Sequence, residues 1–79
     1  MEISTKLIKT LFENIQRHDI NENDTNLVED DIIDSVDIMK LIMEIEKYFN
    51  KSLDAKFIIP NNFEDFQSIQ KMLTQAFVN

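Results

Sequence analysis

The sequence predicts an all-α fold: a small antiparallel bundle of three to four helices with a long first loop. Apolar residues recur at spacings of three and four in two separate segments, which is the pattern of one buried helix face. A polar run rich in asparagine and aspartate separates these segments. Strand-forming residues gather only at Phe57-Ile58-Ile59, which is too short for a sheet. With 79 residues, the chain is expected to form one domain, residues 1–79.

The first helix is expected from about residue 3 to about residue 17. Its polar side carries Lys6, Lys9, Glu13 and Arg17. Its apolar side consists of Ile3, Leu7, Ile8, Leu11, Phe12 and Ile15. The helical pattern then stops until Asp34. Because long loops are uncommon in compact domains, we expect the apolar pairs Leu27-Val28 and Ile32-Ile33 to fix this loop to the core.

The second helix is expected to start at Asp34, whose carboxylate can accept from free amides of the first turn. Asp37, three residues later, completes a pattern like a capping box. Asn50 is suited to the left-handed conformation that ends a helix. The buried stripe is predicted to be Ile38, Leu41, Ile42, Ile45 and Phe49, and a second, partly exposed strip to be Val36, Met39 and Met43.

The rest of the chain is less regular until the last helix. Pro60-Asn61-Asn62 marks a break, and a short helical turn is expected between Asp54 and Asp65. Ser68 is expected to cap the last helix. The inner face of that helix is predicted to be Ile69, Met72, Leu73 and Ala76.

The composition excludes several classes of function. The net charge is −7, and from Asp19 to Glu46 ten acids face a single base, Lys40. Such a chain repels nucleic acid and favours partners with basic surfaces. Without cysteine there is no disulfide and no thiolate metal site. The N-terminus lacks the apolar core of a signal peptide, and no apolar run approaches the roughly 20 residues of a membrane span. We therefore expect a cytoplasmic monomer.

The segment from Thr25 to Phe49 is the most informative part of the sequence. It contains the pair Asp34-Ser35, then Val36, and later Leu41 and Glu44 before the aromatic Phe49. This run resembles the signature of the acyl carrier protein family, which includes peptidyl and D-alanyl carrier proteins.

Three features depart from that signature. Ile32 stands where the family usually has glycine, and Lys40 stands where many fatty-acid carriers have an acid. The stretch from Phe57 to Ile69 is longer and more aromatic than in fatty-acid carriers, and it looks more like D-alanyl or other stand-alone aminoacyl carriers.

The resemblance implies a carrier without catalytic activity. Ser35, preceded by Asp34, would bear a covalent 4′-phosphopantetheine arm, installed by a phosphopantetheinyl transferase and holding acyl or aminoacyl groups as thioesters. The other implied partners are a loading ligase and downstream acyl-transfer enzymes with basic patches, as in fatty acid biosynthesis. The residues expected to contact partners are Val36, Asp37, Met39, Lys40, Met43 and Glu46. Fatty acyl, polyketide, amino acid and D-alanine cargoes all remain open.

Physical chemistry at Ser35 fits this expectation. A phosphodiester at the first position of a helix meets free amides and the positive end of the helix dipole. The only histidine, His18, forms no visible triad, so no catalytic residue is expected. A calcium loop from Asp19 to Asp30 is disfavoured because Asp24 occupies its glycine position, so no metal site is expected. An unmodified interaction module remains an alternative.

Overall fold

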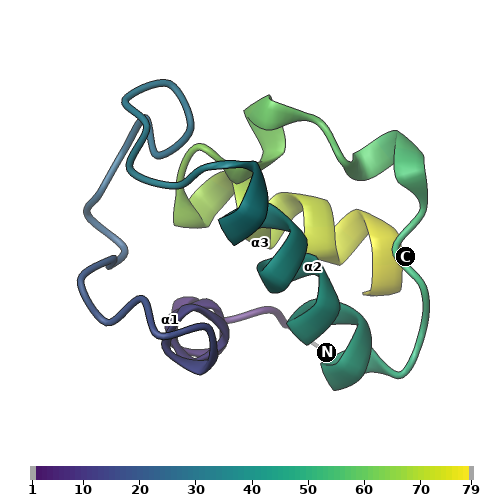
Figure 1. Ribbon diagram of the computed structural model, residues 1–79. Coiled ribbons are helices and arrows are strands. Elements are labelled where there is room, and N and C mark those ends of the chain that lie inside the picture. Colours follow the sequence, from purple (N-terminus) through teal and green to yellow (C-terminus); the bar gives the residue numbers. More distant parts are fainter. Residues whose placement is uncertain (1, 79) are drawn as a thin grey trace.

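The computed structural model describes residues 2–78 and confirms the all-α prediction (Figure 1). The elements in order are α1 (Thr5–Asn14), α2 (Ser35–Phe49), the 3-10 turns η1 (Ala55–Phe57) and η2 (Pro60–Phe63), α3 (Phe66–Leu73) and the π-helical turn η3 (Thr74–Val78). No strand is present in the described part, and none of its helices is long and apolar enough to cross a membrane. The loop from 15 to 34 connects α1 to α2, as predicted.

Helix α1 is shorter than the predicted span of residues 3 to 17. It starts after Ser4, whose Oγ accepts a hydrogen bond from the N–H of Leu7 at 3.1 Å. It stops at Asn14, and Gln16 has a left-handed backbone with φ of 68°. Because such a conformation cannot continue a right-handed helix, Arg17 leaves the polar side of α1 and enters the loop.

Helix α2 starts and ends where the sequence predicts. Asp34 and Asp37 form a capping box. Asn50 closes the helix in the left-handed conformation, with φ of 54° and ψ of 40°. Leu41 and Ile45 are buried. The other three residues of the predicted stripe, Ile38, Ile42 and Phe49, are partly buried against the core.

The predicted cap of the last helix is wrong by three residues. Asp65, not Ser68, is the cap: its Oδ1 accepts from the N–H of Ser68 at 2.7 Å, so α3 starts at Phe66. An aspartate preceding the first turn also suits the positive helix end better than a serine inside it. Beyond α3 the chain widens into η3, where the Phe77 ring stacks on Phe49 of α2 with centroids 4.3 Å apart.

One hydrophobic core joins the three helices and the long loop. Phe12 of α1 stacks on Phe66 of α3, with centroids 5.6 Å apart. The loop contributes Ile20, Leu27 and Ile33, all almost completely buried. The apolar pairs therefore do fix the loop to the core, with Val28 and Ile32 packed partly buried beside them; Ile20 is a further anchor that the sequence pattern did not reveal.

The side chain and backbone of Glu64, just after η2, hold the middle of the loop. The Glu64 carbonyl accepts from the N–H of Leu27 at 2.9 Å. Its Oε1 accepts from the N–H groups of Val28 and Glu29 at 2.9 and 3.1 Å. Three loop amides that would otherwise lack protein partners are thereby satisfied.

We predict that Leu27→Ala lowers the free energy of unfolding by about 2–4 kcal/mol, because it leaves a cavity under the loop. Val28→Ala, at a half-buried neighbouring site, is expected to cost at most about 1 kcal/mol, by the smaller apolar area it removes. Urea unfolding followed by circular dichroism measures both. Equal losses for the two variants would contradict the role of Leu27 as the main anchor.

Candidate functional site

The candidate site is the start of α2, where Ser35 is the first residue of the helix. Its side chain is exposed, as the sequence predicts. Within residues 2–78 no backbone carbonyl accepts from the N–H of Ser35 or Val36. These first-turn amides and the helix dipole make the surroundings of Ser35 favourable for a negatively charged group.

Two aspartates on either side of Ser35 fix the first turn. Asp34 Oδ1 accepts from the N–H of Asp37 at 2.9 Å, and Asp37 Oδ2 accepts from the N–H of Asp34 at 3.1 Å. The N–H of Asp37 is the main reason that the pKa of the Asp34 carboxyl lies below its ordinary value of 3.8. The negative form of Asp34 is thus the one that the turn stabilises.

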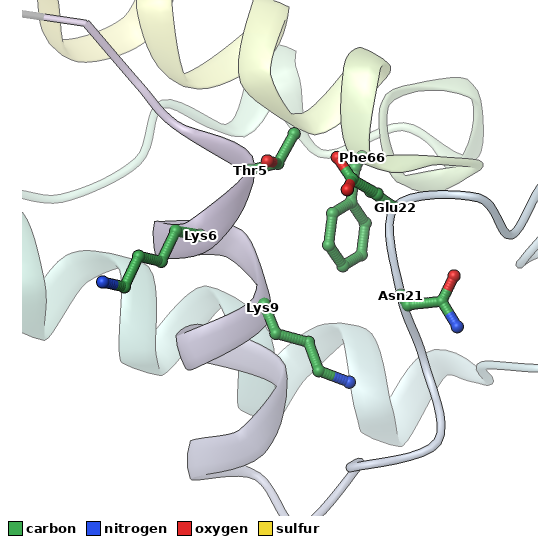
Figure 2. A pocket seen from close by; sticks show the side chains of 6 residues that line it. All are labelled: Thr5, Lys6, Lys9, Asn21, Glu22 and Phe66. Atoms are coloured by element: carbon green, nitrogen blue, oxygen red, sulfur yellow. The ribbon is translucent and has the colours of Figure 1, made fainter.

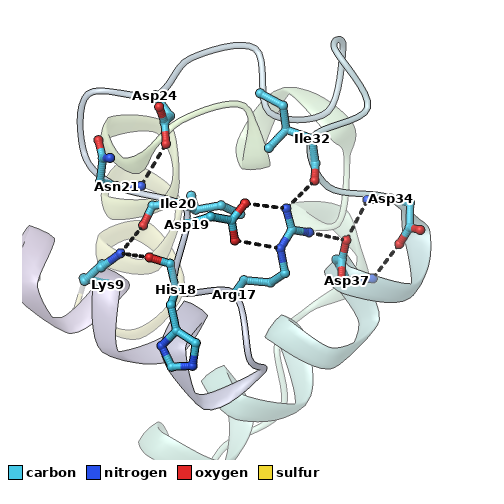
Figure 3. Close-up of polar contacts among 10 residues, drawn as sticks. All are labelled: Lys9, Arg17, His18, Asp19, Ile20, Asn21, Asp24, Ile32, Asp34 and Asp37. Atoms are coloured by element: carbon cyan, nitrogen blue, oxygen red, sulfur yellow. Dashed lines mark hydrogen bonds and ion pairs between the residues drawn. The ribbon is translucent and has the colours of Figure 1, made fainter.

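Arg17 ties the end of α1, the loop and the start of α2 together (Figure 3). Its Nη1 donates to Asp37 Oδ2 at 2.8 Å, and its Nη2 donates to the carbonyl of Ile32 at 2.7 Å. Its Nε and Nη2 also donate to the two carboxylate oxygens of Asp19, each at 3.1 Å. The hydrogen bond with Arg17 is the main cause that lowers the pKa of Asp19. One guanidinium thereby holds both ends of the loop.

The sequence did not reveal this role of Arg17. Its spacing placed it on the polar side of the first helix, where a solvated charge is the usual outcome. The only local signal is Asp19, two residues later. The contacts with Ile32 and Asp37 lie 15 and 20 residues away, and no spacing rule predicts pairs at that separation.

Lys9 has a similar role at the start of the loop. Its ammonium donates to the carbonyls of His18 and Ile20 (Figure 3). Lys9 also lines a hollow of about 330 Å³, together with Thr5, Lys6, Asn21, Glu22 and Phe66 (Figure 2). No residue of α2 lines this hollow, and the charge of Lys9 is already used by the loop, so the hollow adds nothing to the site at Ser35.

An apolar groove of about 250 Å³ opens beside Ser35. Its α2 wall consists of Ser35, Ile38, Met39 and Ile42, and its other wall of Ile58, Ile59, Pro60 and Phe63. Ile58 and Ile59 remain exposed at its rim. The sequence showed their apolar character but not their position, since a run without helical period does not indicate which helix it will face.

The six residues expected to contact partners fall into two groups. Val36, Met39, Lys40 and Met43 are exposed. The carboxylate of Asp37 is taken up by Asp34 and Arg17, as described above. Glu46 is half-buried, and its Oε2 accepts from the N–H of Leu53 at 2.7 Å. The structure thus leaves the apolar and basic members accessible and uses the acidic ones internally.

The calcium alternative gains no support from the geometry. Asp19 is paired with Arg17, and Asp24 accepts from the N–H of Asn21 at 2.9 Å. Across residues 2–78 no group of three or more histidine, aspartate or glutamate side chains is arranged to hold a metal ion.

No protein-family model, curated protein sequence or solved structure matches this chain. Its function therefore has to be inferred from the sequence pattern and from the geometry around Ser35.

We predict that Arg17→Ala lowers the free energy of unfolding by about 1–3 kcal/mol, since it removes hydrogen bonds between charged groups. The side chains of Arg17 and Asp37 are only 23% and 20% exposed, so their pair is better shielded than a surface ion pair. Lys6→Ala, which removes an exposed cation from α1, is the matched control and is expected to change stability by less than about 0.5 kcal/mol. Urea unfolding, with amide hydrogen exchange at Asp34 and Asp37, whose N–H groups are bonded within the capping box, measures both, and equal effects would refute the bridging role.

The pKa of Asp34 gives a prediction with a defined sign. A carboxyl whose pKa is lower in the folded state adds stability above its unfolded pKa, and this contribution is lost as the pH falls through the folded pKa. We therefore expect the Asp34 carboxyl to titrate below 3.8 by NMR, and the start of α2 to fray below that point. Asp34→Asn keeps a good cap without a titrating group, so it should lose this acid-dependent component. Titration of Asp34 at or above 3.8 would contradict the capping geometry.

Proposed function

We propose that this protein is a carrier that bears 4′-phosphopantetheine on Ser35 and presents acyl or aminoacyl groups to partner enzymes. The observation that carries the proposal is the exposed Ser35 hydroxyl at the first position of a doubly capped helix. In a chain with the sequence run from Thr25 to Phe49, this placement is the one that arm attachment requires.

The surroundings of Ser35 fit the arm chemically. The first-turn amides and the positive end of the α2 dipole favour a phosphodiester there. When bound, the arm supplies a thiol, which this cysteine-free chain lacks, and that thiol can hold a cargo as a thioester. Asp34 carries a negative charge next to this position, but its carboxylate is directed to the N–H of Asp37. The amide of Ser35 is left for the phosphate, while that of Val36 also helps to stabilise the Asp34 carboxylate.

The groove beside Ser35 fits a short apolar group. Its volume of about 250 Å³ is below the roughly 300–1,000 Å³ of sites that enclose a drug-sized ligand. Ile38, Ile42 and Phe63 would exclude water from a small acyl chain or from part of the arm. The remainder of a longer cargo would stay outside, so these walls favour short or small cargoes over long chains.

The chain's own residues act as a support and carry no reaction. Arg17, Asp34 and Asp37 hold the first turn of α2 in place, and Ser35 offers an oxygen to an incoming enzyme. Attachment forms a bond between Ser35 Oγ and phosphorus, while the nucleotide half of coenzyme A leaves and the serine proton passes to the transferase. The transferase and the later enzymes have to supply the acids, bases and metal ions.

An unmodified interaction module is the second candidate. The exposed side chains of Val36, Met39 and Met43 favour it, because a stripe of this kind can bind a partner whether or not an arm is present. The two candidates differ in a single measurable property, the covalent group on Ser35.

We predict that the purified chain gains one phosphopantetheine when incubated with coenzyme A and a broad-specificity phosphopantetheinyl transferase. Intact-mass spectrometry measures the gain, and fragmentation assigns it to Ser35. Ser35→Ala is expected to show no gain. Ser52→Ala, which removes a serine that is exposed but lies outside any helix, is the control and should behave like the parent chain.

An unchanged mass with a transferase that modifies a reference carrier in the same tube would reject the carrier and leave the interaction module. A gain that persists in Ser35→Ala would reject the assigned residue. Binding of the groove to a cargo is a separate question, because arm attachment needs only the exposed hydroxyl.

A further inference from the structure

The exposed side of α2 has the opposite charge character to the chain as a whole. The chain carries a net charge of −7. The exposed residues of α2 are Ser35, Val36, Met39, Lys40, Met43, Lys47 and Tyr48. This set contains two lysines and no acid. In Figure 1 no other segment passes in front of α2. The exposure of these side chains leaves them open to a partner.

The acids of α2 are all directed to other parts of the chain. Asp37 contacts Arg17 and the N–H of Asp34. Glu44 Oε1 accepts from Asn14 Nδ2 at 3.3 Å, and Glu46 Oε2 accepts from the N–H of Leu53 at 2.7 Å. All three acids are half-buried. Asp37 and Glu46 are thus occupied within the chain, while Glu44 keeps part of its surface at the edge beside Lys40 and Met43.

Within residues 2–78, Lys40 and Lys47 form no ion pair. In the described part of the chain both ion pairs belong to Arg17, so Lys40 and Lys47 retain their charges for an external group. Glu44 lies four residues after Lys40 and three before Lys47, but its Oε1 accepts from Asn14 and it is in neither of these ion pairs. Their ammonium groups thus remain available at the surface.

These lysines share one helix face with large apolar side chains. We define the α2 stripe as Val36, Met39, Lys40, Met43 and Lys47, which recur at spacings of three and four and so lie along one line. Val36, Met39 and Met43 are 54%, 65% and 66% exposed. Methionine side chains adapt to the shape of a partner. The stripe therefore combines an apolar strip with a cationic edge.

The α2 stripe continues into two hollows. Met39 also lines the groove beside Ser35. At the other edge, Lys40 and Met43 line a hollow of about 270 Å³ with Asn14, Ile15, Gln16 and Glu44. A partner seated on the stripe thus reaches both the candidate attachment site and a recess beside Lys40 that can receive a side chain.

We propose that the α2 stripe docks a partner enzyme whose complementary surface is apolar and edged with carboxylates. Opposite charges across an interface determine which partner binds and in which orientation. The basic patches expected from the sequence would then meet the acidic loop before Asp34, and not the body of α2. A second copy of this chain fits less well, because a symmetric contact between two stripes places lysines against lysines.

This inference rests on the proposed function in one respect only: it takes the partner to be an enzyme that acts at Ser35. The charge preference of the stripe is a property of the surface itself. It is therefore tested on the full chain carrying Ser35→Ala, which cannot bear an arm there. Arm attachment is tested separately by mass, so either proposal can fail alone.

The test uses two synthetic helical peptides with the same apolar face, one edged with glutamate and the other with lysine. Each is titrated into the ¹⁵N-labelled chain at low ionic strength, and amide shifts are followed by NMR. We expect the glutamate-edged peptide to shift the amides of the α2 stripe and to bind there about fivefold more tightly than its twin, given the modest contribution of exposed ion pairs. The lysine-edged peptide should instead shift the acidic loop from Asp19 to Asp31.

Two charge-reversal variants separate local from overall charge. Lys40→Glu with Lys47→Glu is expected to reverse the preference at the stripe. Lys6→Glu with Lys71→Glu makes the same change in net charge at exposed sites outside α2 and should leave the preference intact. The proposal is overturned if the lysine-edged peptide binds the stripe more tightly, if neither peptide shifts it, or if both variants act alike. Stripe shifts that depend on protein concentration alone would indicate self-association and would also reject it.

Discussion

The Arg17 guanidinium is the contact on which the arrangement of the site depends. The loop from 15 to 34 has no helix or strand of its own to fix its course. Arg17 bonds to Asp19 near its start, to Ile32 near its end and to Asp37 beyond it. Because Asp37 also caps the N–H of Asp34, the same carboxylate couples the loop to the first turn of α2. The position of Ser35 therefore follows from a residue 18 positions earlier.

The absence of glycine explains why the loop needs such fixing. The chain has no glycine, yet Gln16, Asn26 and Asp31 adopt left-handed backbone conformations in or next to the loop. Asparagine and aspartate tolerate this region better than other residues, while glutamine does so at some cost. The left-handed residue Asp31 precedes Ile32, the position where the resemblance led us to expect a glycine. The cost of these left-handed conformations is offset by the burial of Leu27 and Ile33, by the hydrogen bonds that Glu64 accepts from loop amides and by the contacts of Arg17.

The sequence predicted the parts of the site that depend on neighbours within one helical turn. The pair Asp34 and Asp37, the cap at Asn50 and the exposure of Ser35 all follow from spacings of a few residues. The contacts of Arg17 and Glu64 link segments 15 to 36 residues apart, and no periodic pattern encodes them. The error at Ser68 also arose because a local pattern was not sufficient. Asp65 and Ser68 both suit a cap, and only the path of the preceding chain, after η2, decides between them.

A division of charge follows from these internal contacts. Asp37 and Glu46 satisfy amides and an arginine inside the chain, so the net charge of −7 does not describe the exposed residues of α2. The internal bonds that hold α2 in place are thus the same bonds that leave Lys40, Lys47 and the methionines outermost. Recognition at this face is then a consequence of how the helix is anchored. Overall composition does not predict this placement, because it counts an acid equally whether it faces a partner or a backbone amide.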